Sequence, residues 1–191
     1  MSEQALIGPN AILQMLPVLE ETGGPALVDR IVAAAGLFNL PDGSSMIPEG
    51  EAGALHQALR RVCPSQAPDL AAQAGERTAR YILAHRIPKP AQHILKALPA
   101  PLAARSLARA IGKHAWTFAG SGRFEVETPW RFKIHANPIV RGEASQHPLC
   151  HWHSAVFAKL YQSLVAPDCT CRETSCCAQP GQTACTFELT R

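Results

Sequence analysis

The sequence predicts an α+β protein in which a helical first half packs with an antiparallel sheet in the second half. Two features of the chain indicate this class. Apolar residues recur at helical spacing up to about residue 115, and from residue 123 they alternate with polar residues. The chain has 191 residues, of which 47% are hydrophobic, and this suits one compact unit with a substantial core.

Glycines and prolines mark the limits of the helices in the first half. The Gly8-Pro9-Asn10 run introduces the first helix, the Gly23-Gly24-Pro25 run separates it from the second, and Gly36 ends the second. Residues 39–50 are rich in turn-forming residues and indicate a loop. From these limits we expect helices at residues 10–21, 25–35, 49–62, 67–86, 91–98 and 101–115.

A period of two in the second half predicts four strands. Residues 123–127 and 130–135 alternate polar residues with aromatic and β-branched ones, so they should pair as antiparallel neighbours. A helix is expected at residues 149–164, followed by strands at 169–175 and 183–189. The helices should therefore form a layer on an antiparallel sheet.

A cysteine cluster near the C-terminus predicts a metal site. Thiolates are strong zinc ligands, and a carboxylate such as that of Glu173 can supply a fourth corner of a tetrahedron. Because Cys150 lies far upstream, the metal would tie a separate segment to the C-terminal end. Cys63 stands apart before Pro64 and is expected to be a buried thiol. The six clustered cysteines are Cys150, Cys169, Cys171, Cys176, Cys177 and Cys185.

Disulfides are the alternative for these cysteines. The Met1-Ser2-Glu3-Gln4 start does not resemble the basic region of a secretory signal peptide, and no long apolar region follows it. Seven is also an odd number of cysteines. We therefore expect a reducing, cytoplasmic setting, where a cysteine cluster more often serves metal or redox chemistry.

Composition argues against two classes of partner. The net charge of +3 is too small to indicate nucleic-acid binding, and the sequence has no dense stripe of Lys and Arg. The longest apolar stretches, such as residues 31–35, are far too short to cross a bilayer. We expect neither a nucleic-acid partner nor a transmembrane segment.

The second half resembles the vinyl-4-reductase domain. In that domain a cysteine opens a helix and is followed by Glu-x-x-Cys, a glycine, and a final cysteine close to an aromatic residue. The matching residues here lie in residues 148–153, in Arg172-Glu173-Thr174-Ser175-Cys176, and at Gly181, Cys185 and Phe187. The resemblance covers about residues 115–190. Residues 7–12 are similar to the bacteriochlorophyll 4-vinyl reductase proteins of photosynthetic bacteria, which add an N-terminal helical part to this domain.

The resemblance has consequences for the fold and the assembly. It implies a helical region at residues 1–100 and a ligand-binding domain at residues 101–191, together forming one unit. Similar domains serve as aromatic-ligand sensors in bacterial transcription activators and share a fold with a Golgi-transport family. The sensor relatives imply a homodimer.

The resemblance also implies the metal ligands. Carried over from the zinc site of the sensor relatives, they fall on Cys150, Glu173, Cys176 and Cys185. Spacing from Glu173 favours Cys176, whereas spacing back from Cys185 favours Cys177, and so does strand parity. We prefer Cys176 and keep Cys177 as the alternative. Cys169 and Cys171 share the face of Glu173 and are expected to be buried strand cysteines, with ligation as their second interpretation.

Three thiolates and one carboxylate fill a tetrahedral shell, which favours a structural zinc over a catalytic one. A position at the start of a helix should also lower the pKa of Cys150.

The family name implies reduction of a vinyl group on a chlorophyll precursor, which needs a reductant. The sequence has no Gly-x-Gly-x-x-Gly strand-to-helix turn, no ferredoxin cysteine run and no flavin motif. We therefore expect a tetrapyrrole-binding protein that acts as a carrier or accessory factor in bacteriochlorophyll synthesis, with enzymes of that pathway as partners. A vinyl reductase with an external electron donor is the alternative, and an aromatic small-molecule sensor is the third possibility.

A magnesium porphyrin needs a large apolar pocket and an axial nitrogen or oxygen ligand. We expect this pocket between the helices at 101–115 and 149–164 and the first two strands. His114 and His153 are the axial candidates because both are expected to face the core, and Arg109 could pair with a propionate. For any single one of these residues an ordinary core or surface position is the simpler explanation. The predicted ligand-binding residues are His114, His153, Trp116, Phe124, Phe132, Trp152, Phe157 and Arg109.

Overall fold

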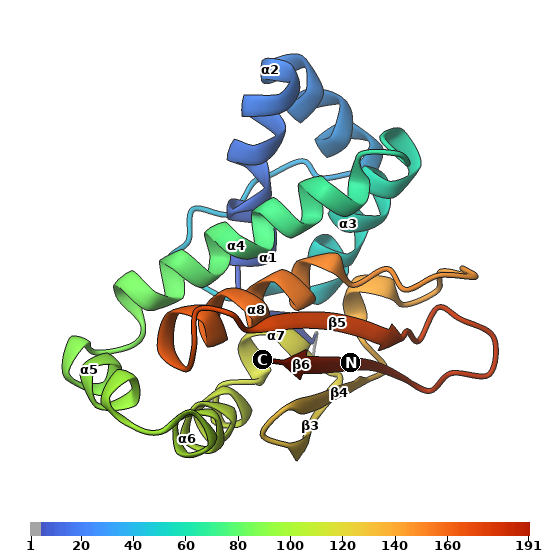
Figure 1. Ribbon diagram of the computed structural model, residues 1–191. Helices are drawn as coiled ribbons and strands as arrows, with labels where there is room; N and C mark the ends of the chain where they lie inside the picture. The colour runs from blue at the N-terminus through green and yellow to red at the C-terminus, as the bar shows by residue number, and fades with distance from the viewer. Residues whose placement is uncertain (1–4) are drawn as a thin grey trace.

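The computed structural model describes residues 5–191 and has helices layered over one face of a four-stranded antiparallel sheet (Figure 1). The strand order is β3-β4-β6-β5, so two hairpins lie side by side and the last strand of the chain is central. This confirms the α+β class and all four predicted strands. The strands are β3 (Arg123–Thr128), β4 (Arg131–His135), β5 (Thr170–Ser175) and β6 (Ala184–Thr190).

Helix α8 (His151–Leu164) lies along the sheet, and α4 (Ala67–His85) packs on the other side of α8 (Figure 1). The two helices approach closely at Gly75 of α4. A Cβ atom added there would lie 2.3 Å from the carbonyl oxygen of Trp152, so only glycine permits this spacing.

The N-terminal region adds a short sheet and three helices beside α4. β1 (Leu6–Ile7) pairs with β2 (Ile47–Pro48). The predicted break at Gly23-Gly24 is present as a kink within α2, where Gly24 has a φ of +66°, a value that glycine adopts without strain. The three helices are α1 (Asn10–Leu13), α2 (Met15–Ala35) and α3 (Glu49–Val62).

Two helices connect α4 to the sheet at one edge of the molecule (Figure 1). α5 (Lys89–Ala97) begins two residues earlier than expected, because Pro90 lies in the first turn, where a missing N–H costs nothing. None of the α5 residues is buried, whereas α6 (Ala100–Lys113) buries one face. The sequence analysis missed α7 (Trp116–Ala119), the 3-10 helix η1 (Pro138–Val140) and the β1–β2 pair, since elements this short show no periodicity.

The hydrophobic core is continuous between the two halves of the chain and includes Ile12 and Leu55 as well as Phe132, Phe157 and Phe187. Within residues 5–191, no helix is both long enough and apolar enough to cross a membrane.

Candidate metal centre and aromatic cluster

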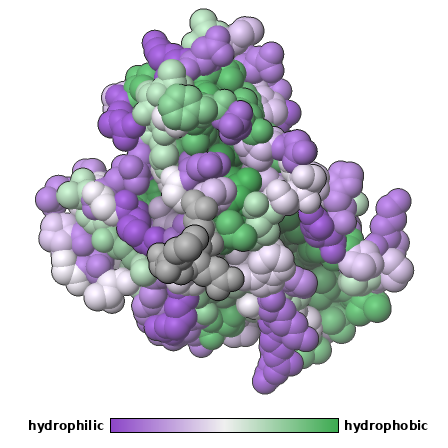
Figure 2. Space-filling model, turned by 180° about the vertical axis from the view of Figure 1, so that it is seen from behind, coloured by the Kyte–Doolittle hydropathy of each residue, from purple (hydrophilic) through white to green (hydrophobic). Residues whose placement is uncertain are grey.

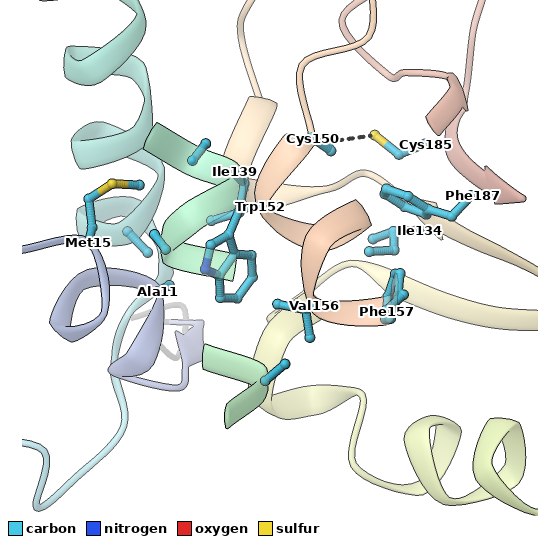
Figure 3. Packing of buried hydrophobic residues seen from close by; sticks show 14 of the residues in the cluster. Ala11, Met15, Ile134, Ile139, Cys150, Trp152, Val156, Phe157, Cys185 and Phe187 are labelled. Carbon is cyan, nitrogen blue, oxygen red and sulfur yellow. Dashed lines mark hydrogen bonds between the residues drawn. The ribbon is translucent and has the colours of Figure 1, made fainter. Parts of the chain in front are cut away.

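The metal-site candidates come from three elements that meet above the sheet. Cys185 lies on β6 opposite Ile134 of β4 and is fully buried. Cys150 directly precedes α8, and its thiol donates to Cys185 Sγ over 3.4 Å (Figure 3). Glu173 lies on β5 opposite Phe187 of β6. The sheet therefore presents Cys185 and Glu173 to the beginning of the helix that covers it.

A β-bulge decides which of the two adjacent cysteines joins this group. The register of β5 shifts between Glu173 and Ser175, and the strand ends there. The expected alternation of a regular strand is therefore lost, and Cys176 turns toward Cys185, with their Sγ atoms 3.7 Å apart. The Cys177 thiol is directed to the carbonyl oxygen of Ile134, 3.6 Å away. Strand parity was thus a wrong guide at this position.

One ligand atom from each of Cys150, Glu173, Cys176 and Cys185 lies within 4.8 Å of the other three, and all four residues are buried. Ligands about 2.3 Å from a tetrahedral zinc would lie about 3.8 Å apart, which is close to the observed sulfur–sulfur distances of 3.4 and 3.7 Å. The donor set and its spacing fit a tetrahedral thiolate-binding ion.

The Glu173 carboxylate has one satisfied and one unsatisfied oxygen. The backbone N–H of Cys150 donates to Oε2 over 2.6 Å, whereas Oε1 is buried and has no hydrogen-bond partner. A buried polar atom without a partner costs about 1–3 kcal/mol, and more when it is charged. An ion bound between the three sulfurs and this oxygen would remove that cost.

Asn137 supports the sulfurs and was missed by the sequence analysis. Its side chain is fully buried, and Nδ2 donates to Cys150 Sγ over 3.2 Å and to Cys185 Sγ over 3.6 Å. The preceding Ala136 has a φ of +50°, which is uncommon for a residue other than glycine. The only sequence signal is the Asn-Pro pair, which marks a turn. The backbone N–H of Cys177 adds a third donor, 3.3 Å from Cys185 Sγ.

The protonation of the group differs from the sequence-based expectation. Burial raises the pKa of Cys150 well above its usual value, so the predicted lowering by the helix start is wrong. Burial and the Cys176 charge raise the pKa of Glu173 to about 8. Hydrogen bonds from the Cys150 and Cys185 thiols lower the pKa of Cys176, which makes Cys176 the thiolate of the group. Binding of a cation would release the remaining protons.

The other cysteines lie outside this group, and all seven are free thiols. Cys169 is fully buried, and Cys171 on β5 is half-buried opposite Leu189. Burial raises the pKa of Cys171 to about 12. Cys63 is buried, with the Arg30 guanidinium 3.7 Å from its sulfur.

The predicted ligand-binding aromatics form a packed cluster between α8 and the sheet. The Phe157 ring lies 5.2 Å from that of Phe132 and 5.3 Å from that of Phe187 (Figure 3). Phe124 is half-buried and lies 5.4 Å from Phe132. The Trp152 indole N–H donates to Thr78 on α4 over 3.2 Å. These rings touch one another, so in this conformation they form core rather than the wall of an open pocket.

The two predicted axial histidines have opposite environments. His153 is buried, with Nε2 3.3 Å from the carbonyl oxygen of Phe118 and Nδ1 without a partner. Burial lowers the pKa of His153 to about 4, which keeps the ring neutral at pH 7. His114 follows the last residue of α6 and is exposed, so the prediction that it faces the core is wrong. Trp116 and Arg109 are exposed as well.

Two surface pockets lie away from this cluster, and both are small. Their volumes are about 210 and 230 Å³, below the ~300 Å³ at which ligand pockets usually begin. The smaller one is lined by Arg60, Pro64, Ala67, Pro68, Ala71, Leu149 and His151, and the larger by Glu49, Gly50, Gly53, Ala54, Gln57, Pro138 and Arg141.

The fold and the cysteine group define a class of protein. Residues 130–191 match the vinyl-4-reductase domain, in agreement with the resemblance seen in the sequence. An H-NOX protein from S. oneidensis is similar with a TM-score of 0.58 at 8% identity, over 96% of this chain and 98% of that chain. An H-NOX protein from K. algicida is similar with a TM-score of 0.57 at 15% identity, over 96% of each chain. The protein is therefore a vinyl-4-reductase-domain protein with an H-NOX-like α+β fold.

Two sequence relatives define the family more closely. The bacteriochlorophyll synthase 23 kDa chain of Cereibacter sphaeroides is 54% identical over 185 residues, which cover 96% of this chain and 89% of the relative. That of Rhodobacter capsulatus is 47% identical over 189 residues, covering 98% and 88%. The chain belongs to the bacteriochlorophyll synthase 23 kDa chain family.

Proposed function

We propose that this protein binds a tetrapyrrole intermediate of bacteriochlorophyll synthesis and presents it to enzymes of that pathway in the cytoplasm. The observation that carries this proposal is the 54% identity, over 96% of the chain, to a bacteriochlorophyll synthase chain. The fold adds support, because one of the similar H-NOX structures was determined to study heme distortion, and heme is a tetrapyrrole.

The aromatic cluster is the proposed place for the macrocycle, with His153 as its axial ligand. The unpartnered Nδ1 of His153 is buried among aromatic rings, and a neutral imidazole nitrogen can coordinate magnesium or another porphyrin metal. Entry of a macrocycle requires the half-buried rings of Phe118 and Phe124 to move away from Phe157. α6 covers this side of the cluster and would move with them.

We also propose that Cys150, Glu173, Cys176 and Cys185 hold one zinc ion with a structural role. The spacing of the three sulfurs and the unpartnered Glu173 Oε1 support this assignment. When bound, the zinc would link the start of α8 to the β5–β6 hairpin, and Asn137 would donate hydrogen bonds to two of its thiolates. A homodimer, as the resemblance to the sensor relatives implies, is part of the same proposal.

Titration of the purified protein with magnesium protoporphyrin tests the tetrapyrrole proposal. We expect a dissociation constant in the micromolar range or below, which corresponds to about −8 kcal/mol, together with a shift of the Soret band. His153→Ala should abolish the shift, whereas the exposed His114→Ala should retain it. Absence of binding by the wild-type protein would refute the carrier role. Consumption of a divinyl substrate with a supplied reductant would favour the vinyl reductase instead.

A further inference from the structure

Charge is distributed very unevenly along the chain. Residues 77–124, here called the cationic segment, contain nine of the eighteen Lys and Arg residues and none of the fifteen Asp and Glu residues. The rest of the chain therefore has nine cations against fifteen acids. The small net charge of +3 conceals this asymmetry. The cationic segment includes the end of α4 and all of α5, α6 and α7.

The cations on α5 and α6 are exposed and free. Arg105, Arg109 and Lys113 are spaced four residues apart, on the side of α6 opposite to its buried face, which includes Leu107 and Ile111. Among residues 5–191, the ion pairs include none of these three and neither Lys89 nor Lys96 of α5. In contrast, three cations nearer the ends of the segment are neutralised by acids: Arg77 by Glu21, Arg80 by Glu76, and Arg123 by Glu125.

Large apolar side chains accompany the free cations. Leu102 lies one turn before Arg105 on α6 and is 52% exposed, and Trp116 follows the end of the helix and is 57% exposed. Ile94 of α5 is 63% exposed, and α5 buries none of its residues. Figure 2, which views the molecule from behind, shows hydrophobic and hydrophilic residues side by side at its lower right, where these helices lie. The surface is therefore amphipathic as well as cationic.

We propose that the exposed side of α5, α6 and the Trp116 turn docks on the surface of a membrane that contains anionic lipids. Amphipathic helices with Lys and Arg beside Trp and Leu bind in the interface plane, where the cations meet lipid phosphates and the apolar side chains enter the headgroup layer. Tryptophan in particular favours this depth. Charge complementarity selects this occupant, because the segment has no acid to repel an anionic headgroup. This docking is independent of the proposed tetrapyrrole binding.

Cosedimentation of the full chain with vesicles tests the proposal. Binding is expected to phosphatidylcholine vesicles that contain phosphatidylglycerol, to be weak with phosphatidylcholine alone, and to fall at high salt because salt screens the charges. The variant Arg105→Gln/Arg109→Gln/Lys113→Gln should lower the partition coefficient on the order of 100-fold, since each cation contributes about fivefold. The matched control Arg61→Gln/Arg172→Gln/Arg191→Gln removes the same charge outside the cationic segment and should change it by less than about threefold.

The fluorescence of Trp116 gives a second readout, because Trp152 is buried and Trp130 half-buried. Anionic vesicles should shift the emission of the wild-type protein to the blue, and Trp116→Phe should remove most of that shift while retaining vesicle binding. Absence of binding to anionic vesicles overturns the proposal, and so does equal weakening by the two triple variants. Loss of magnesium protoporphyrin binding in the α6 variant, with vesicle binding unchanged, would assign this face to the pigment instead.

Discussion

The backbone N–H of Cys150 donates a 2.6 Å hydrogen bond to Oε2 of Glu173, and this bond joins the start of α8 to β5. Because the same carboxylate leaves Oε1 buried without a partner, the bond orients Glu173 so that its free oxygen belongs to the cysteine group. The metal proposal depends on this relationship.

We expect about one zinc per chain in protein purified without chelator, with sulfur ligands at about 2.3 Å. Elemental analysis gives the stoichiometry, and X-ray absorption at the zinc edge gives the ligand type and distance. Protein that contains no metal, or zinc bound only by nitrogen and oxygen, would contradict the assignment.

Substitution of single cysteines should separate Cys185 from Cys177. Cys185→Ser removes a ligand of a structural metal, whose binding energy is also folding energy, so the free energy of unfolding should fall by about 3 kcal/mol or more, or about 6–12 °C in Tm. Cys177→Ser should cost less than about 1 kcal/mol, because its thiol is half-buried and directed away from the group. Calorimetry and zinc content of both variants check this. Zinc loss in Cys177→Ser alone would identify Cys177 as the ligand.

His56 should make stability depend on pH in the acidic range. The side chain is buried, its Nε2 lies 3.1 Å from the carbonyl oxygen of Ala11, and burial lowers its pKa to about 3. The unfolded chain has the ordinary value of about 6.5 and therefore binds a proton that the folded state does not. The His56 contribution is complete above pH 6.5 and is lost as pH falls toward 3, with a slope of up to about 1.4 kcal/mol per pH unit.

Denaturant unfolding of the wild-type protein and of His56→Gln at several pH values measures this slope. The variant should be less stable at pH 7 but should lose stability more slowly on acidification. Part of the slope should persist in the variant, because burial lowers the pKa of His153 to about 4. Parallel curves for the two proteins would show that His56 does not carry the effect.

Two glycine-to-alanine substitutions should have opposite effects. In Gly75→Ala the added methyl group would collide with the Trp152 carbonyl and with Ala155, so α4 and α8 must separate, at a cost of about 1–3 kcal/mol. In Gly50→Ala on α3 the methyl group meets no atom within 4 Å, so the better helix propensity should leave stability unchanged or raise it by up to about 1 kcal/mol. The free energies of unfolding of both variants decide; equal effects would mean that the α4–α8 contact adapts freely.

Most elements could be predicted because their signals are local. The helix at residues 149–164 and the strands at 123–127 and 130–135 have apolar residues at the period of their own backbone. The kink at Gly23-Gly24 follows from residues that stop a helix wherever they occur. The motif around Glu173 also identified the four residues that the structure brings together.

The sequence by itself determined the α+β class and the residue types available for a metal, because backbone periodicity and ligand chemistry are properties of short segments. Only the tertiary structure decided that a bulge after Glu173 turns Cys176 inward, that Asn137 supports the sulfurs, and that His114 is exposed. It also brought the unpaired cations of α5 and α6 to one edge of the molecule (Figure 1). These outcomes depend on strand register and on packing between segments far apart in the chain, which no local pattern specifies.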